Sequence, residues 1–156
     1  EKLVYAMTNN QVFLDYKKID SLQLDDQKIK SVIIRFLKKQ EGFSFVADME
    51  ALSQSSIPEP IKTMAINGYN YKRSGDIQVI LEPQWYGAYK DNTGTTHGAW
   101  NPYDSHIPLV FMGWGIKKGN THAPASMTDI APTLAALLHI QMPNGCIGTP
   151  ISDLFK

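Results

Sequence analysis

The chain has 156 residues, of which 43% are hydrophobic and 19% are charged, as is typical of one globular domain with a sizeable core. Fifteen basic residues balance fifteen acidic ones, and the basic pairs at 38–39 and 117–118 stand alone, so we expect no nucleic-acid-binding surface. No apolar run approaches the length of a transmembrane segment, and the single cysteine, Cys146, excludes an internal disulfide.

The first eighty residues are predicted to combine strands with helices. Residues 3–7 and 11–16 are rich in Val, Phe and Tyr and flank an Asn-Asn pair, which predicts a β-hairpin. The apolar runs 43–47 and 77–81 predict two further strands, and a short helix over 61–68 lies between them.

The most regular pattern in the sequence is a helix that begins after Asp25 or Asp26. Basic residues at 38–39 suit the negative end of its dipole, and Gly42 is a natural terminator. Its apolar residues recur at helical spacing and predict one buried stripe, made of Ile29, Val32, Ile33, Phe36 and Leu37.

Beyond residue 106 the pattern predicts a buried strand at 107–112 and a helix capped by Thr128 or Asp129. Pro132 is tolerated in the first turn of this helix, because early amides have no helical acceptor. The side chains expected to face inward are Leu134, Leu137 and Leu138. The fold class that follows is α/β, with a small mixed sheet flanked by helices in one domain.

Residues 82–106 read as a long loop rich in Trp and Tyr, and loops of this length are usually functional or disordered. Its aromatic content argues against disorder. The segment Thr-Gly-Thr-Thr-His-Gly at 93–98 holds His97, and its glycines let the backbone approach a bound group closely. His97 is the best candidate for a metal ligand, but one His cannot hold a catalytic metal alone. A loop His bonded to the backbone is the alternative, and spacing leaves both open.

The other candidate residues have structural explanations. His106 is expected to bond a neighbouring carbonyl or carboxylate, His122 to be solvated in a turn, and His139 to complement a helix dipole. Cys146 lies in a turn-rich stretch and reads as a structural thiol. Neither a catalytic triad nor a glycine-rich phosphate loop follows from the spacing.

Three stretches of the chain form a recognisable series. They comprise residues 67–69 with 73–77, residues 94–98 with 103–109, and residues 128–134 with 143–145 and 148–151. Together and in this order they resemble the C-terminal part of the alkaline phosphatase superfamily, in particular the bacterial phosphodiesterase/nucleotide-pyrophosphatase-like alkaline phosphatases. The resemblance covers most of the chain from about residue 60 on and is weaker before it.

The resemblance implies a periplasmic or secreted enzyme in which two zinc ions, some ~4 Å apart, hold a phosphate ester while a Thr or Ser hydroxyl attacks phosphorus. In such enzymes the His of the Thr-His-Gly segment is a zinc ligand, which assigns the metal to His97. The catalytic positions of the family match none of Thr95, Thr96, Asp104 and His106, so no catalytic residue is assigned to this chain.

The nucleophile and the remaining ligands of the family belong to an upstream region. We therefore expect residues 1–156 to be the C-terminal portion of an alkaline phosphatase-like domain, inactive and without firmly bound zinc on its own. Cutting there exposes apolar surface, so we expect self-association into a dimer or larger oligomer. The expected substrate is a phosphate monoester. The alternatives are phosphodiester or nucleotide pyrophosphate cleavage on the same scaffold, or a non-catalytic binding module that uses the aromatic loop 85–103.

Overall fold

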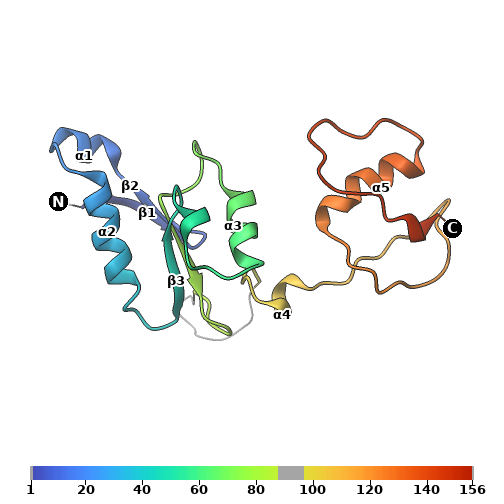
Figure 1. Ribbon diagram of the computed structural model, residues 1–156, viewed down its shortest axis with the longest axis horizontal. Helices are drawn as coiled ribbons and strands as arrows, with labels where there is room; N and C mark the ends of the chain where they lie inside the picture. Colours follow the sequence, from blue (N-terminus) through green and yellow to red (C-terminus); the bar gives the residue numbers. More distant parts are fainter. Residues whose placement is uncertain (1, 88–96, 156) are drawn as a thin grey trace. The chain divides into compact units, whose positions relative to one another are not determined.

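The computed structural model describes residues 2–87 and 97–155, and the chain divides into two compact units, Glu1–His106 and Ile107–Lys156 (Figure 1). The first unit is built on a β-sheet with helices, and the second on a short helix surrounded by loops (Figure 1). The α/β class predicted from the sequence is confirmed. Among the described residues, no helix combines the length and the apolar character needed to cross a bilayer.

The sheet has four strands in the order β1-β2-β4-β3. Their bounds are Val4–Thr8 for β1, Gln11–Leu14 for β2, Phe43–Asp48 for β3 and Ile77–Leu81 for β4. All three ladders between these strands are antiparallel, where we expected a mixed sheet. The predicted hairpin joins β1 to β2 through Asn9 and Asn10, whose φ angles of 50° and 58° suit a two-residue turn. A turn this short can connect only antiparallel strands.

Helices follow the hairpin on one side of the sheet. The helix α1 (Tyr16–Ser21) was not predicted, and the Asp15 side chain caps it by accepting a hydrogen bond from the Lys18 amide at 3.2 Å. The predicted helix is α2 (Asp26–Leu37), whose cap is Asp25. It ends five residues before Gly42, so the glycine does not terminate it.

The buried stripe of α2 differs from the predicted one. Val32 and Phe36 are 60% and 62% exposed, while Leu37 is buried and Lys30 is only 2% exposed. The Lys30 ammonium group lies 2.8 Å from Glu50 and 3.6 Å from Asp48. Compared with the prediction, α2 therefore turns a different face toward the sheet. The ion-paired Lys30, rather than Val32 and Phe36, completes its buried face.

Two apolar clusters cover the two faces of the sheet. One joins β2, β3 and β4 to α2, and the other joins β3 and β4 to α3 (Ile61–Gly68), which lies on the opposite side of the sheet (Figure 1). The alternation of side chains along β4 explains the division, because Val79 belongs to the first cluster and Ile80 to the second. The strands predicted at 43–47 and 77–81 are therefore confirmed, each with both faces covered.

The second unit is organised around Asp129 and the helix α5 (Ile130–Leu137). Asp129 accepts backbone hydrogen bonds from Thr149 and Ser126 at 2.9 Å and 2.8 Å, and these bonds lower its pKa. Thr133, which is fully buried, donates to the Asp129 carbonyl and accepts from the Ile151 amide. Residues 128–134 and 148–151, two parts of the third stretch that carries the resemblance, are thus tied together by hydrogen bonds.

Two predictions for this second unit are wrong. Leu134 and Leu138 are 45% and 62% exposed, because α5 buries Pro132, Thr133 and Ala135 instead. Residues 107–112 form no strand, since within the described part of the chain they have no hydrogen-bonded neighbour. Val110 and Met112 are 82% and 94% exposed.

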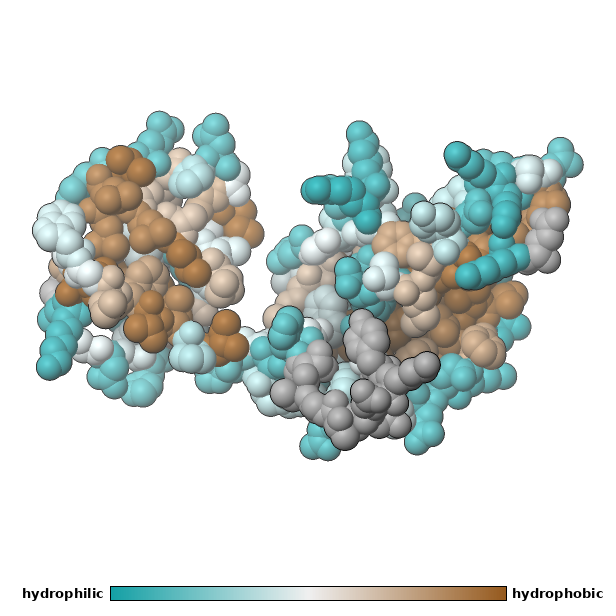
Figure 2. Space-filling model, turned by 180° about the vertical axis from the view of Figure 1, so that it is seen from behind, coloured by the Kyte–Doolittle hydropathy of each residue, from teal (hydrophilic) through white to brown (hydrophobic). Residues whose placement is uncertain are grey.

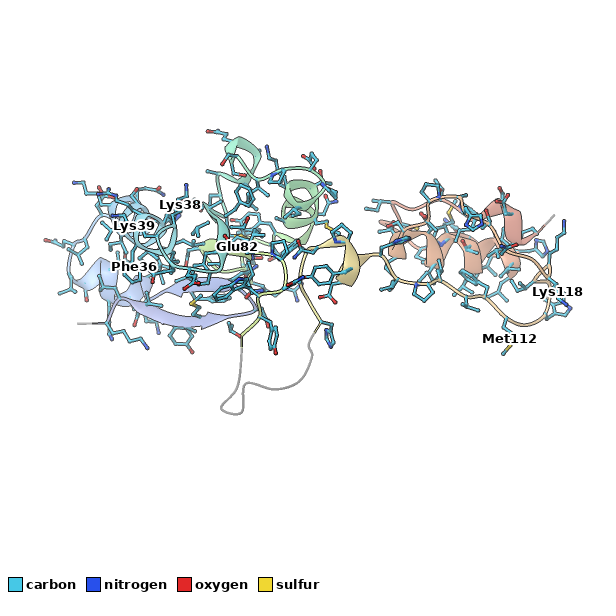
Figure 3. All side chains as sticks on the ribbon, turned by 90° about the horizontal axis from the view of Figure 1, so that it is seen from below. Phe36, Lys38, Lys39, Glu82, Met112 and Lys118 are labelled. Atoms are coloured by element: carbon cyan, nitrogen blue, oxygen red, sulfur yellow. The ribbon has the colours of Figure 1, made fainter. Side chains whose placement is uncertain are left out.

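Much of the apolar surface of the second unit is open to solvent. Figure 2 shows hydrophobic residues gathered over one face of this unit, and Figure 3 shows the Met112 side chain pointing away from it. Residues 107–112 have the composition of a strand but no partner strand in the described part of the chain. Like an unpaired sheet edge, such a segment can associate with another chain.

Candidate functional site

His97 lies at the edge of a cavity in the first unit. Of the segment predicted to carry it, residues 93–96 lie outside the described part of the chain, while His97 and Gly98 are described. His97 is exposed and lines a cavity of ≈ 260 Å³. Gly98 has φ +104°, a conformation that favours glycine.

The cavity is lined by two stretches of the loop, 84–87 and 97–104, together with the hairpin turn and the end of β4. Four aromatic residues contribute to it, namely Trp85, Tyr86, Trp100 and Tyr103. The polar residues of the lining are Asn10, Gln84, His97 and Asp104. The site therefore combines flat apolar walls with a few hydrogen-bonding groups, as small-molecule sites do.

Hydrogen bonds to Tyr103 join the two loop stretches, and one to Asp104 fixes the second stretch internally. The Tyr103 hydroxyl accepts from the Gln84 amide at 2.8 Å and from Asn101 Nδ2 at 3.3 Å. The Asp104 carboxylate accepts from the Ala99 amide at 2.7 Å. Both anchors reside on the short helix α4 (Pro102–Ser105), so the backbone that follows His97 is fixed within seven residues of it.

The two tryptophans attach the site to the sheet. Trp100 packs against the apolar cluster beneath α3. The Trp85 ring lies on Gly42, where an added Cβ atom would come within 2.6 Å of ring carbon Cδ2. The Glu82 amide, three residues before Trp85, donates to the Gly42 carbonyl at 2.8 Å. Gly42, which we expected to end a helix, instead makes room for an aromatic wall.

Among the described residues of the lining, His97 and Asp104 carry side chains of the kinds that bind zinc. Across residues 2–87 and 97–155, no group of three or more His, Cys, Asp or Glu side chains is placed to hold a metal ion. His106 ends α4, with its backbone amide donating to the Pro102 carbonyl at 2.9 Å, and it does not line the cavity. His139 follows α5 with a φ of +52°, in keeping with a place beyond the helix C-terminus.

Comparison with known proteins shows the origin of this fold. No family model matches the chain. The chain is 49% identical to the alkaline phosphatase PhoV of Synechococcus elongatus, over 97% of its own length and 27% of that protein. All of it superposes on 30% of the crystal structure of the alkaline phosphatase PafA, with a TM-score of 0.95 and 46% identity. Over nearly its whole length the chain therefore corresponds to a part of alkaline phosphatases of this kind. It spans less than a third of the length of these relatives.

A further relative of the chain carries a different name. A protein of Myroides odoratus named calcium-transporting ATPase is 51% identical over 99% of the chain and 28% of that relative. The resemblance seen in the sequence is confirmed by the two alkaline phosphatases, and the partial alkaline phosphatase-like fold is confirmed by the superposition. The family sheet and helices are thus present in part in these 156 residues.

Sequence reasoning found the aromatic residues of the cavity but not the residues that support them. The density of Trp and Tyr in 85–103 was a visible signal. Asn10 and Gly42 gave no such signal, because each reaches the site only when strands distant in sequence pair, as when β2 and β3 both pair with β4.

Proposed function

We propose that this chain is part of a zinc-dependent phosphatase that hydrolyses phosphate monoesters, and that His97 is one of its metal ligands. The supporting observation is the combination of 46% identity to the alkaline phosphatase PafA along the whole chain with the position of His97 at the edge of a lined cavity. In this proposal both units belong to one alkaline phosphatase-like domain, and the enzyme is periplasmic or secreted.

The donor chemistry at the site fits zinc in part. A neutral imidazole is a preferred zinc ligand, bound at ~2.0–2.1 Å, and His97 is exposed on the cavity rim where an ion can reach it. The described residues add no further cluster of donors, so the remaining ligands and the Thr or Ser nucleophile would come from the rest of the family fold. On its own the chain would then be inactive and would bind zinc weakly.

The residues around His97 would act by holding this ligand in place. A pair of zinc ions, when bound, supplies charge neutralisation for the phosphoryl group and activation of the attacking hydroxyl. The contribution of this chain is rigidity, because the Ala99–Asp104 hydrogen bond and the packing of Trp100 limit how far the backbone after His97 can move.

Two other activities are compatible with the sequence. Cleavage of phosphodiesters or nucleotide pyrophosphates on the same scaffold would use the same His97 ligand, and the substrate contacts that distinguish it lie elsewhere in the fold. A purely binding role for the loop 85–103 would leave His97 without a metal. Measuring metal content separates this role from both hydrolytic activities.

The proposal is tested on the full-length protein that carries this segment. Zinc content is measured by mass spectrometry, and hydrolysis of a chromogenic phosphate monoester and of the matching diester is followed with and without chelator. We expect His97→Ala to lower zinc content and to reduce the monoester rate by more than roughly 100-fold, since even residues behind a ligand cost 10–100-fold when mutated.

His106→Ala is the matched control. His106 is exposed, lies in the same unit and does not line the cavity, so its replacement should leave the zinc content unchanged. Exchange of the two outcomes, with zinc lost from His106→Ala and kept in His97→Ala, would show that the ligand is assigned to the wrong residue. A diester rate above the monoester rate would transfer the activity to the second hydrolytic class.

A further inference from the structure

The cavity beside His97 has walls suited to a flat apolar group. Trp85, Tyr86 and Tyr103 line it and remain 42%, 40% and 60% exposed. Solvent-exposed aromatic side chains that line one cavity together with a few polar groups are typical of ligand sites rather than of a closed hydrophobic core.

We propose that this cavity binds the organic group of the substrate, and that it prefers a planar, uncharged group such as a phenyl ring or a nucleobase. The inference rests on the proposed function, in which the phosphoryl group is held at His97. Because His97 and the aromatic residues line the same cavity, an ester bound at His97 would place its organic group among the rings. This chain would then influence substrate selectivity as well as metal binding.

The walls of the cavity are set before any ligand arrives. The Tyr103 ring is held by two hydrogen bonds to its hydroxyl, from the Gln84 amide and from Asn101. The Trp85 ring rests on Gly42, and Trp100 is anchored in the cluster beneath α3. The free-energy cost of ordering these side chains around a ligand would therefore be small, which favours binding by a small molecule.

The charges around the cavity explain why the group should be uncharged. Its described lining contains one carboxylate, that of Asp104, and neither Lys nor Arg. The Asp104 carboxylate would therefore repel an additional anionic group on the substrate. Asn10 and Gln84 add amide groups that can bond the edge of a polar ring.

The size of the cavity limits the group to one ring system. Its volume of ≈ 260 Å³ lies just below the ~300–1,000 Å³ of typical small-molecule sites. A phenyl or nucleobase group fits such a space, whereas a large polymeric substrate would extend beyond it.

The first test uses this chain alone, without metal. Phenol is titrated while the three tryptophan indole N–H signals are followed by NMR, with cyclohexanol as a non-planar control and benzoate as an anionic one. We expect the signals of Trp85 and Trp100 to shift while that of Trp114, which lies in the other unit and is 82% exposed, stays still. Phenol should bind about two- to tenfold more tightly than cyclohexanol, and benzoate more weakly than phenol.

The second test uses variants in the full-length protein. Trp85→Ala and Tyr86→Ala should each lower the ratio of kcat/KM for phenyl phosphate to that for cyclohexyl phosphate by about two- to tenfold, through loss of ring stacking. Inhibition by inorganic phosphate should be unchanged in both variants, because phosphate has no organic group. Trp114→Ala is the matched control and should leave the ratio as it is.

The outcomes distinguish this inference from the proposed function. An unchanged selectivity ratio in both aromatic variants, or equal shifts of all three tryptophan signals, would overturn the inference even if His97→Ala abolished activity. Conversely, retained activity and zinc in His97→Ala would overturn the proposed function, while specific phenol binding by this chain would still support the cavity as a binding site for planar groups.

Discussion

Gly42 offers a direct test of how the aromatic site is attached to the sheet. Its φ is +82°, and a Cβ added there would lie 2.6 Å from Trp85 Cδ2, far inside ordinary van der Waals distance. An alanine in this left-handed conformation costs about 1–2 kcal/mol. The ring must also move away, and because Trp85 is already 42% exposed, its weakened packing costs about 1 kcal/mol more. Gly42→Ala should therefore destabilise the first unit by about 2–3 kcal/mol.

Gly68→Ala is the matched control, because Gly68 ends α3 and has nothing within 4 Å of its added Cβ. We expect this variant to be neutral or to gain up to about 1 kcal/mol, since alanine favours helix. Urea unfolding is followed by the indole signals of Trp85 and Trp100, which report on the first unit. Equal stability of the two variants, or an unmoved Trp85 signal in Gly42→Ala, would refute the packing of this ring on the glycine.

Three other predictions concern charge and apolar surface. Lys30→Ala should lower the free energy of unfolding, measured in urea, by about 1–3 kcal/mol. The loss is smaller than for a fully buried pair because Glu50, the nearest carboxylate, is 63% exposed. Lys28→Ala, which removes an exposed ion pair, should lower it by less than about 0.5 kcal/mol. The backbone hydrogen bonds of Asp129 lower its pKa in the folded state. They therefore stabilise the second unit at pH values above about 3.9, the ordinary aspartate pKa, and this stabilisation is lost as the pH falls from there through the lowered pKa. Asp129→Asn should therefore flatten the acid-induced loss of stability seen by circular dichroism, and an unchanged acid profile would contradict this. Light scattering at micromolar concentration should find a dimer or larger oligomer that Val110→Lys with Met112→Lys dissociates, and a clean monomer of the unsubstituted chain would count against self-association.

Local patterns predicted the elements that depend on neighbouring residues. The Asn9-Asn10 turn, the cap at Asp25 and the strand at 77–81 each follow from a few adjacent side chains, and each is present. The face that a helix buries depends on what lies opposite it. For α2 the sequence pattern included Phe36 in the buried stripe, but the inner face is completed by Lys30 and its carboxylate partners.

The prediction of a strand at 107–112 shows a different limit. Its composition is that of a buried strand, yet a strand exists only with a neighbour, and the described residues provide none. The candidate site was predicted only in part, because some of its residues also depend on contacts between distant strands. His97 and the aromatic loop were visible in sequence, whereas the supports at Asn10 and Gly42 depend on long-range strand pairing.

The sparse interior of the second unit has a consequence for how the chain folds. Its most deeply buried side chains are Pro132, Thr133 and Ala135, all small, and Asp129 and Thr133 knit its loops by hydrogen bonds. Such a body opens readily, so its amide protons should exchange with solvent sooner than those of β4. A protein surface that packs on the exposed Leu134 and Leu138 would slow this exchange. The second unit would then reach its full stability only after it packs against that surface.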